Sequence, residues 1–230
     1  MKIGVVWCTF CERRVWWSRQ SQVQLQLRDA YRPPSLFASI MRRAGHDVEV
    51  LSCDDLLEVK DVGKDAQAVD IFYIMAHGTF DQAGYSVLLH AADWQPAVAG
   101  LGGAPRLTVA IFDTCKLLDS ARVPNWRAVW AVAGIGPHLR LLLGFDGPAV
   151  IDRESALRGL AFAEDILAGV PFARAWVGAV AKTCGHSQYR RAVAIGIGNS
   201  PADAQVILDT ASLANMPGPR GPGLHMEARY

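Results

Sequence analysis

The sequence of 230 residues contains no long apolar run, and this absence excludes several classes of protein. No stretch approaches the roughly 18 apolar residues of a membrane-spanning helix, and the apolar run at the N-terminus is too short for the core of a signal peptide. A formal net charge of +1 leaves no basic excess for binding nucleic acid. We therefore expect a cytoplasmic protein with neither a membrane nor a nucleic-acid partner.

The chain contains few cysteines, and their number, five, is odd. In a chain without a secretory signal this favours free thiols over a disulfide framework. Cys8 and Cys11 form a C-x-x-C motif, but a zinc site needs a second ligand pair, and only Cys184 and His186 offer anything similar. The Gly-x-Gly pairs complete no phosphate-binding pattern. We therefore predict neither a metal site nor a cofactor.

What the sequence does contain is a series of short apolar segments separated by helical patterns. Six of them are expected to be strands, at residues 2–7, 47–52, 69–77, 106–115, 138–145 and 192–199. Strands that alternate with helices predict a three-layer α/β/α sandwich with a mostly parallel, about six-stranded sheet. Residues 1–215 are expected to form this single domain, and residues 216–230, rich in Pro and Gly, to be a flexible tail.

Two helices are expected between the fifth and sixth of these strands. Asp152 is expected to cap the first, which ends at Gly169 and turns Leu157, Leu160, Ala163 and Leu167 inward. Pro171 begins the second, which buries an apolar face at helical spacing, namely Phe172, Ala175, Trp176, Ala179 and Val180.

The chemically capable residues follow two of the apolar segments. The segment 69–77 ends at His77, and the segment 106–115 ends at Cys115. Because ligands bind outside the carboxyl ends of the strands in open α/β sheets, we expect both side chains at the same edge. An imidazole beside a thiol can take its proton and hold a nucleophilic thiolate ready.

His77 with Gly78, and Asp113 two residues before Cys115, give the chain a family resemblance. It resembles the caspase-like cysteine peptidases, which include metacaspases, legumains and CHAT domains. The resemblance implies the caspase-like fold, Cys115 as nucleophile, His77 as its base, and the amides of Gly78 and Cys115 as the oxyanion hole. The chain departs from metacaspases after the cysteine, where Lys116-Leu117-Leu118 replaces their usual His-Ser-Gly.

Two charged groups are candidates for substrate binding. Asp113 is expected to face the same side as Cys115, where an ionised carboxylate favours a basic substrate residue, as in the metacaspases that this motif resembles. Arg13 and Arg14 lie after the first strand, in the region from which caspases draw an arginine that selects aspartate. We favour the basic preference, because only Asp113 has a fixed register relative to Cys115. A third interpretation is that Asp113 pairs with one of these arginines and selects nothing.

The sequence favours a cysteine-dependent hydrolase that cleaves peptide or protein substrates through an acyl-enzyme. Two alternatives stay open. An amine that resolves the same acyl-enzyme gives a ligase or cyclase, and a caspase-like domain without activity serves as an interaction module. The tryptophan-rich segment 7–17 and the residues after Cys115 are the features that suggest this module. The sequence makes no prediction about the oligomeric state.

Overall fold

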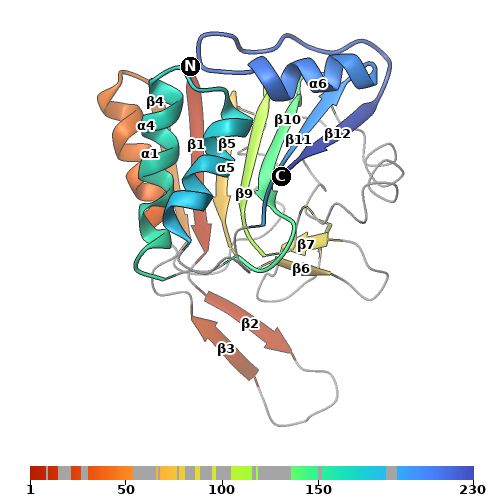
Figure 1. Ribbon diagram of the computed structural model, residues 1–230. Helices are drawn as coiled ribbons and strands as arrows, with labels where there is room; N and C mark the ends of the chain where they lie inside the picture. Colours follow the sequence, from red (N-terminus) through yellow and green to blue (C-terminus); the bar gives the residue numbers. More distant parts are fainter. Residues whose placement is uncertain are drawn as a thin grey trace.

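A seven-stranded, mostly parallel β-sheet forms the centre of the computed structural model (Figure 1). Its strand order is β4 (Asp47–Cys53), β1 (Lys2–Cys8), β5 (Ile71–Met75), β9 (Val109–Asp113), β10 (Leu141–Phe145), β11 (Ala192–Gly198) and β12 (His225–Arg229). The first five are parallel, whereas β11 is antiparallel to β10 and β12 to β11. The α/β class and all six predicted strands are confirmed, and β12 is an additional strand.

The structure describes the greater part of the chain, and the statements below concern that part. It comprises residues 1–8, 10–14, 22–26, 31–53, 66, 68–76, 78–80, 86–88, 95–96, 105–115, 118, 136–149, 152–184 and 191–230.

The central strands form because their side chains are apolar on both faces of the sheet. Every residue of β5, β9 and β10 is buried, as expected for parallel strands that are covered on both sides. Successive residues alternate between two cores, so that Tyr73 and Ile111 join one cluster while Phe72 and Ala110 join the other. The sheet is therefore the boundary between two apolar layers.

Four α-helices of the described residues pack against one face of the sheet. They are α1 (Arg32–Arg43), α4 (Arg158–Leu167), α5 (Phe172–Thr183) and α6 (Pro201–Thr210), and Figure 1 draws α1, α4 and α5 side by side over that face. The opposite face, around Phe72, Phe112 and Val193, is equally buried. This arrangement is consistent with three layers.

A reciprocal contact between Asp152 and Ser155 precedes the helical segment that contains α4. The Ser155 amide donates to the Asp152 carboxylate at 2.7 Å, and the Asp152 amide donates to the Ser155 hydroxyl at 2.7 Å. A short 3₁₀ turn, η2 (Ser155–Leu157), then leads into α4, and Gly169 ends the segment with a φ of 85°. Asp152 therefore lies before the 3₁₀ turn and is not the N-cap of α4, which is Leu157, whereas Gly169 follows the end of the helix as predicted.

The predicted inward face of this segment was partly wrong. Leu157 and Leu167 are 50% and 40% exposed, whereas Arg158, Phe162 and Ile166 are fully buried. These three residues are spaced by four and so share one face of the helix. An arginine therefore occupies a core position at the first turn of α4.

The last residues of the chain do not form the flexible tail that their Pro and Gly content predicted. His225–Arg229 form β12, whose backbone pairs with β11 from Ala194 to Gly198. The Met226 side chain is buried in the core on the face opposite the helices. The seventh strand therefore covers an edge of β11 that would otherwise present unpaired backbone groups.

Two small sheets follow the carboxyl ends of central strands. The hairpin of β2 (Phe10–Arg14) and β3 (Gln22–Gln26) comes after β1. The sheet of β6 (Gly78–Phe80), β7 (Ser86–Leu88) and β8 (Gln95–Pro96) comes after β5. Figure 1 places both at the same end of the central sheet, which is the end where β9 leads to Cys115.

Candidate active site

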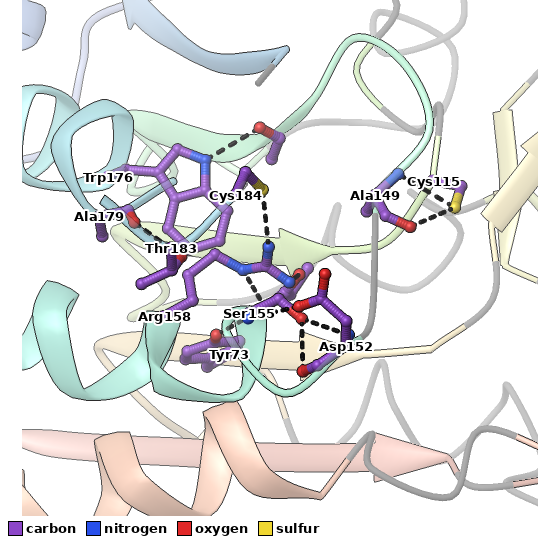
Figure 2. A network of polar contacts seen from close by, with 12 residues as sticks. Tyr73, Cys115, Ala149, Asp152, Ser155, Arg158, Trp176, Ala179, Thr183 and Cys184 are labelled. Carbon is purple, nitrogen blue, oxygen red and sulfur yellow. Dashed lines mark hydrogen bonds and ion pairs between the residues drawn. The ribbon is translucent and has the colours of Figure 1, made fainter. Parts of the chain in front are cut away.

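Cys115 lies at the carboxyl end of β9, two residues beyond the end of the strand, and its side chain is half-buried. Its thiol donates to the carbonyl oxygen of Ala149 at 3.4 Å, and the amide of Ala149 donates to the sulfur at 3.3 Å (Figure 2). Ala149 follows the end of β10, the next strand of the sheet. The thiol is therefore held between two adjacent strand ends, with a backbone donor directed at the sulfur.

The segment that carries Ala149 is itself fixed to the sheet. Asp146, the first residue after β10, is buried, and its carboxylate accepts a hydrogen bond from Arg191 at 3.1 Å. The Asp146 amide donates to the Arg191 carbonyl oxygen at 2.8 Å. These contacts anchor the backbone that surrounds Cys115.

The other predicted catalytic groups are only partly covered by the structure. His77 lies outside the described residues, although the strand before it is well defined and pairs Met75 with Asp113. Gly78 is the first residue of β6 and pairs with Leu88. Arg13 and Arg14 fall in β2, for which the structure describes the backbone pairing alone.

Asp113 does not lie where the sequence predicted. Its side chain is fully buried, and both carboxylate oxygens contact Arg158, with Nη2 at 2.7 Å from Oδ1 and Nε at 3.0 Å from Oδ2. The hydroxyl of Tyr73 donates to Oδ2 at 2.9 Å. The expectation that this carboxylate faces a basic substrate residue is therefore corrected, because an arginine of the protein already occupies that role. This partner is Arg158, and not Arg13 or Arg14.

Arg158 is the residue that sequence reasoning missed. Its guanidinium lies 4.9 Å from the centroid of the Phe145 ring, and Nη1 is 3.8 Å from the sulfur of Cys184 (Figure 2). A fully buried arginine beside an aromatic ring and a carboxylate has both a cation–π and an ionic partner. The signal in the sequence was the spacing of four to Phe162 and Ile166, which places residue 158 on the inner face of the helix.

Burial and the ionic pair together control the ionisation of this region. Burial, and then the negative charge of Asp113, raise the pKa of Tyr73 well above its ordinary value of 10.0. Burial lowers the pKa of Arg158, but the charge of Asp113, the hydrogen bond to it and the neighbouring Tyr73 and Cys184 together outweigh burial and raise that pKa. Burial also raises the pKa of the Cys184 thiol above 9.0. Tyr73 is therefore a neutral hydrogen-bond donor, and Arg158 a permanent cation.

We expect alkaline pH to destabilise the protein through Tyr73. Because the folded-state pKa is raised, the phenol gives its full stabilisation below pH 10.0, and this is lost as the pH rises and the unfolded chain ionises first. The loss for one such group reaches about 1.4 kcal/mol per pH unit. Tyr73→Phe removes the ionisable hydroxyl. The free energy of unfolding, measured from pH 8 to 11, should therefore fall less steeply in this variant than in wild type. Parallel curves for the two proteins would contradict the assignment.

Among the described residues, no group of three His, Cys, Asp or Glu side chains could hold a metal ion. In that part of the chain, no helix is long and apolar enough to cross a membrane.

Three comparisons with known proteins bear on this site. A family model described as "Domain of unknown function (DUF6345)" matches residues 54–205, which include β5, β9, β10 and α4. No curated protein matches the chain. Among solved structures, the crystal structure of protein GSU0716 from Geobacter sulfurreducens shares 13% identity, with a TM-score of 0.45. That match covers 76% of this chain and 88% of the other.

Proposed function

The chain belongs to the DUF6345 family, and we propose that it is a caspase-like cysteine hydrolase that cleaves peptides through Cys115 and His77. The family description names no activity, so the proposal depends on the geometry of the site. His77, Gly78 and Cys115 all fall within the matched residues.

The pairing of β5 with β9 is the observation that carries the proposal. The two strands are parallel neighbours, and their last paired residues are Met75 and Asp113. His77 and Cys115 each follow two residues later in the sequence, so the same register continued would bring them directly opposite. Because side chains alternate along a strand, both would also leave the sheet on the same face.

The strand order gives further support. Cys115 follows β9, which lies between β5 and β10, so the strand ends on both sides can contribute to one site. β5 leads to His77 and Gly78, and β10 leads to Ala149, whose backbone contacts the thiol. The carboxyl edge of a parallel sheet is where such folds bind their ligands.

The reaction follows from these groups. His77 takes the proton of the Cys115 thiol, and the thiolate attacks the carbonyl carbon of the scissile peptide bond. The amides of Gly78 and Cys115 stabilise the negative charge on the oxygen. His77 then returns the proton to the leaving amine, and water hydrolyses the thioester to free the thiol.

The substrate is a peptide segment in extended conformation. The Ala149 carbonyl oxygen lies beside the thiol and can accept a second hydrogen bond, from the backbone of a peptide of any sequence. A preference for basic residues is not part of the proposal, because Asp113 already has Arg158 as its partner.

A panel of peptides that differ only in the residue before the cleaved bond tests the proposal. We expect the full-length protein to cleave at least one member of a panel with Arg, Lys, Asp, Asn or Leu at that position, and His77→Ala to slow cleavage at least about 100-fold. An added amine that becomes joined to the acyl group would assign acyl transfer in place of hydrolysis. If no peptide is cleaved and an alkylating probe labels Cys115 no faster than a free thiol, the proposal fails.

A further inference from the structure

Three side chains form a buried ionic cluster at the end of β9, the strand that leads to Cys115. They are Tyr73, Asp113 and Arg158, and each is less than 2% exposed. Asp113 accepts hydrogen bonds from Tyr73 at 2.9 Å and from Arg158 at 3.0 Å. The proposed chemistry uses none of these three groups, although Asp113 stands only two residues before Cys115.

The cluster joins the elements whose ends make up the site. Tyr73 is the middle residue of β5, four residues before His77, and Asp113 is the last residue of β9. Arg158 reaches both from α4, and its guanidinium also stacks on Phe145, the last residue of β10. Figure 2 labels Tyr73 and Arg158, and both side chains donate hydrogen bonds to the Asp113 carboxylate.

We propose that the buried ionic cluster positions Cys115 relative to His77, so that Tyr73 and Arg158 are positioning residues for the reaction. This inference rests on the proposed function. The Tyr73 hydroxyl links β5 to β9 through the Asp113 carboxylate. These are the two strands that lead to His77 and Cys115. Arg158 holds that carboxylate in one orientation through two of its nitrogens.

Positioning of this kind affects the rate because proton transfer depends steeply on geometry. A displacement of about 1 Å at a catalytic group can cost 100-fold in rate. Apolar side chains at these positions could also fill the core, but they would not fix the distance and angle between β5 and β9. Hydrogen bonds to a single carboxylate set both a distance and an angle, which is the property that a base and its nucleophile need.

A double-mutant cycle between Tyr73 and His77 tests the inference on the full-length protein. The measured quantity is the rate of Cys115 alkylation by iodoacetamide, followed by mass spectrometry of the peptide that contains Cys115. We expect His77→Ala to slow alkylation about 100-fold and Tyr73→Phe about tenfold. The double variant should be no slower than His77→Ala alone, because a displaced strand has no effect once the base is absent.

Thr108→Val is the matched control, since it also removes a buried hydroxyl, but from the residue just before β9, at the end of that strand opposite to Cys115. The Thr108 hydroxyl donates to the Arg106 carbonyl oxygen at 3.2 Å, and Val109–Asp113, the whole of β9, separates Thr108 from Cys115 in the sequence. This variant should alkylate at the wild-type rate. Every variant is assayed at a temperature where its unfolding curve shows the native state.

The outcomes separate the inference from the function on which it rests. If Tyr73→Phe alkylates as fast as Thr108→Val, or if its effect multiplies that of His77→Ala, the positioning role is overturned and the dyad stands. If His77→Ala leaves the rate unchanged, the dyad fails and the inference fails with it.

Discussion

Cys115→Ala should abolish peptide hydrolysis and leave the fold intact. Without a thiol no acyl-enzyme can form, so kcat/KM should fall at least about 1,000-fold, as for other nucleophile deletions. The loss of stability should be small, because the side chain is half-buried and its hydrogen bonds with the Ala149 backbone, which Figure 2 shows, are long, at 3.3 and 3.4 Å. We expect about 1 kcal/mol from these contacts.

Activity and the free energy of unfolding are measured on the same preparation. Cys115→Ser is the matched variant, because a hydroxyl can replace both contacts with Ala149 but is a much weaker nucleophile. It should unfold at nearly the wild-type denaturant concentration and still be inactive. A folded Cys115→Ala protein that cleaves peptides at the wild-type rate would show that the sulfur is not the nucleophile.

The strands that carry this site could be predicted from sequence because burial on both faces leaves an unbroken apolar run. Ile71–Met75 and Val109–Asp113 consist almost wholly of such residues, and each ends where the polar residues begin. The register between them, which pairs Met75 with Asp113, depends on contacts between distant segments and had to come from the structure.

Arg158 shows why the rest of the site was missed. Because an arginine is expected at the surface, the pattern of leucines at 157, 160 and 167 predicts that they form the inner face of the helix. The position becomes favourable only because Asp113, which is 45 residues away in the chain, supplies a buried countercharge. A sequence pattern describes one helix or strand at a time. A buried ion pair joins two such elements, here α4 and β9, and so cannot be predicted from the pattern of either.

The same reasoning explains the error at the C-terminus. Pro and Gly from Pro217 to Gly223 predicted a flexible tail, and the short segment His225–Arg229 shows no apolar run. As an edge strand it needs only one buried side chain, Met226, and a free strand edge on β11 to pair with. The sequence of this segment alone does not reveal that β11 has an edge with unpaired backbone groups.

Arg158→Met should be the most destabilising of the substitutions considered. It leaves the Asp113 carboxylate buried without its cation, a change that costs about 3–5 kcal/mol in comparable buried pairs. Chemical denaturation at pH 7 measures this loss, and a drop of that size is a large part of the 5–15 kcal/mol that typically stabilises a domain. Lys182→Met breaks the exposed pair with Asp165, whose lysine is 58% exposed, and should cost less than about 1 kcal/mol.

A second substitution tests whether the loss of stability in Arg158→Met comes from the Asp113 carboxylate. In Arg158→Met the buried Asp113 carboxylate has no cation beside it, and the cost of burying this charge should account for most of the loss of stability against wild type. Adding Asp113→Asn should restore part of the stability at pH 7, because the neutral amide oxygen still accepts from the Tyr73 hydroxyl. A deficit that Asp113→Asn leaves unchanged would mean that Arg158 stabilises the protein by packing on Phe145, and not by holding the carboxylate before Cys115.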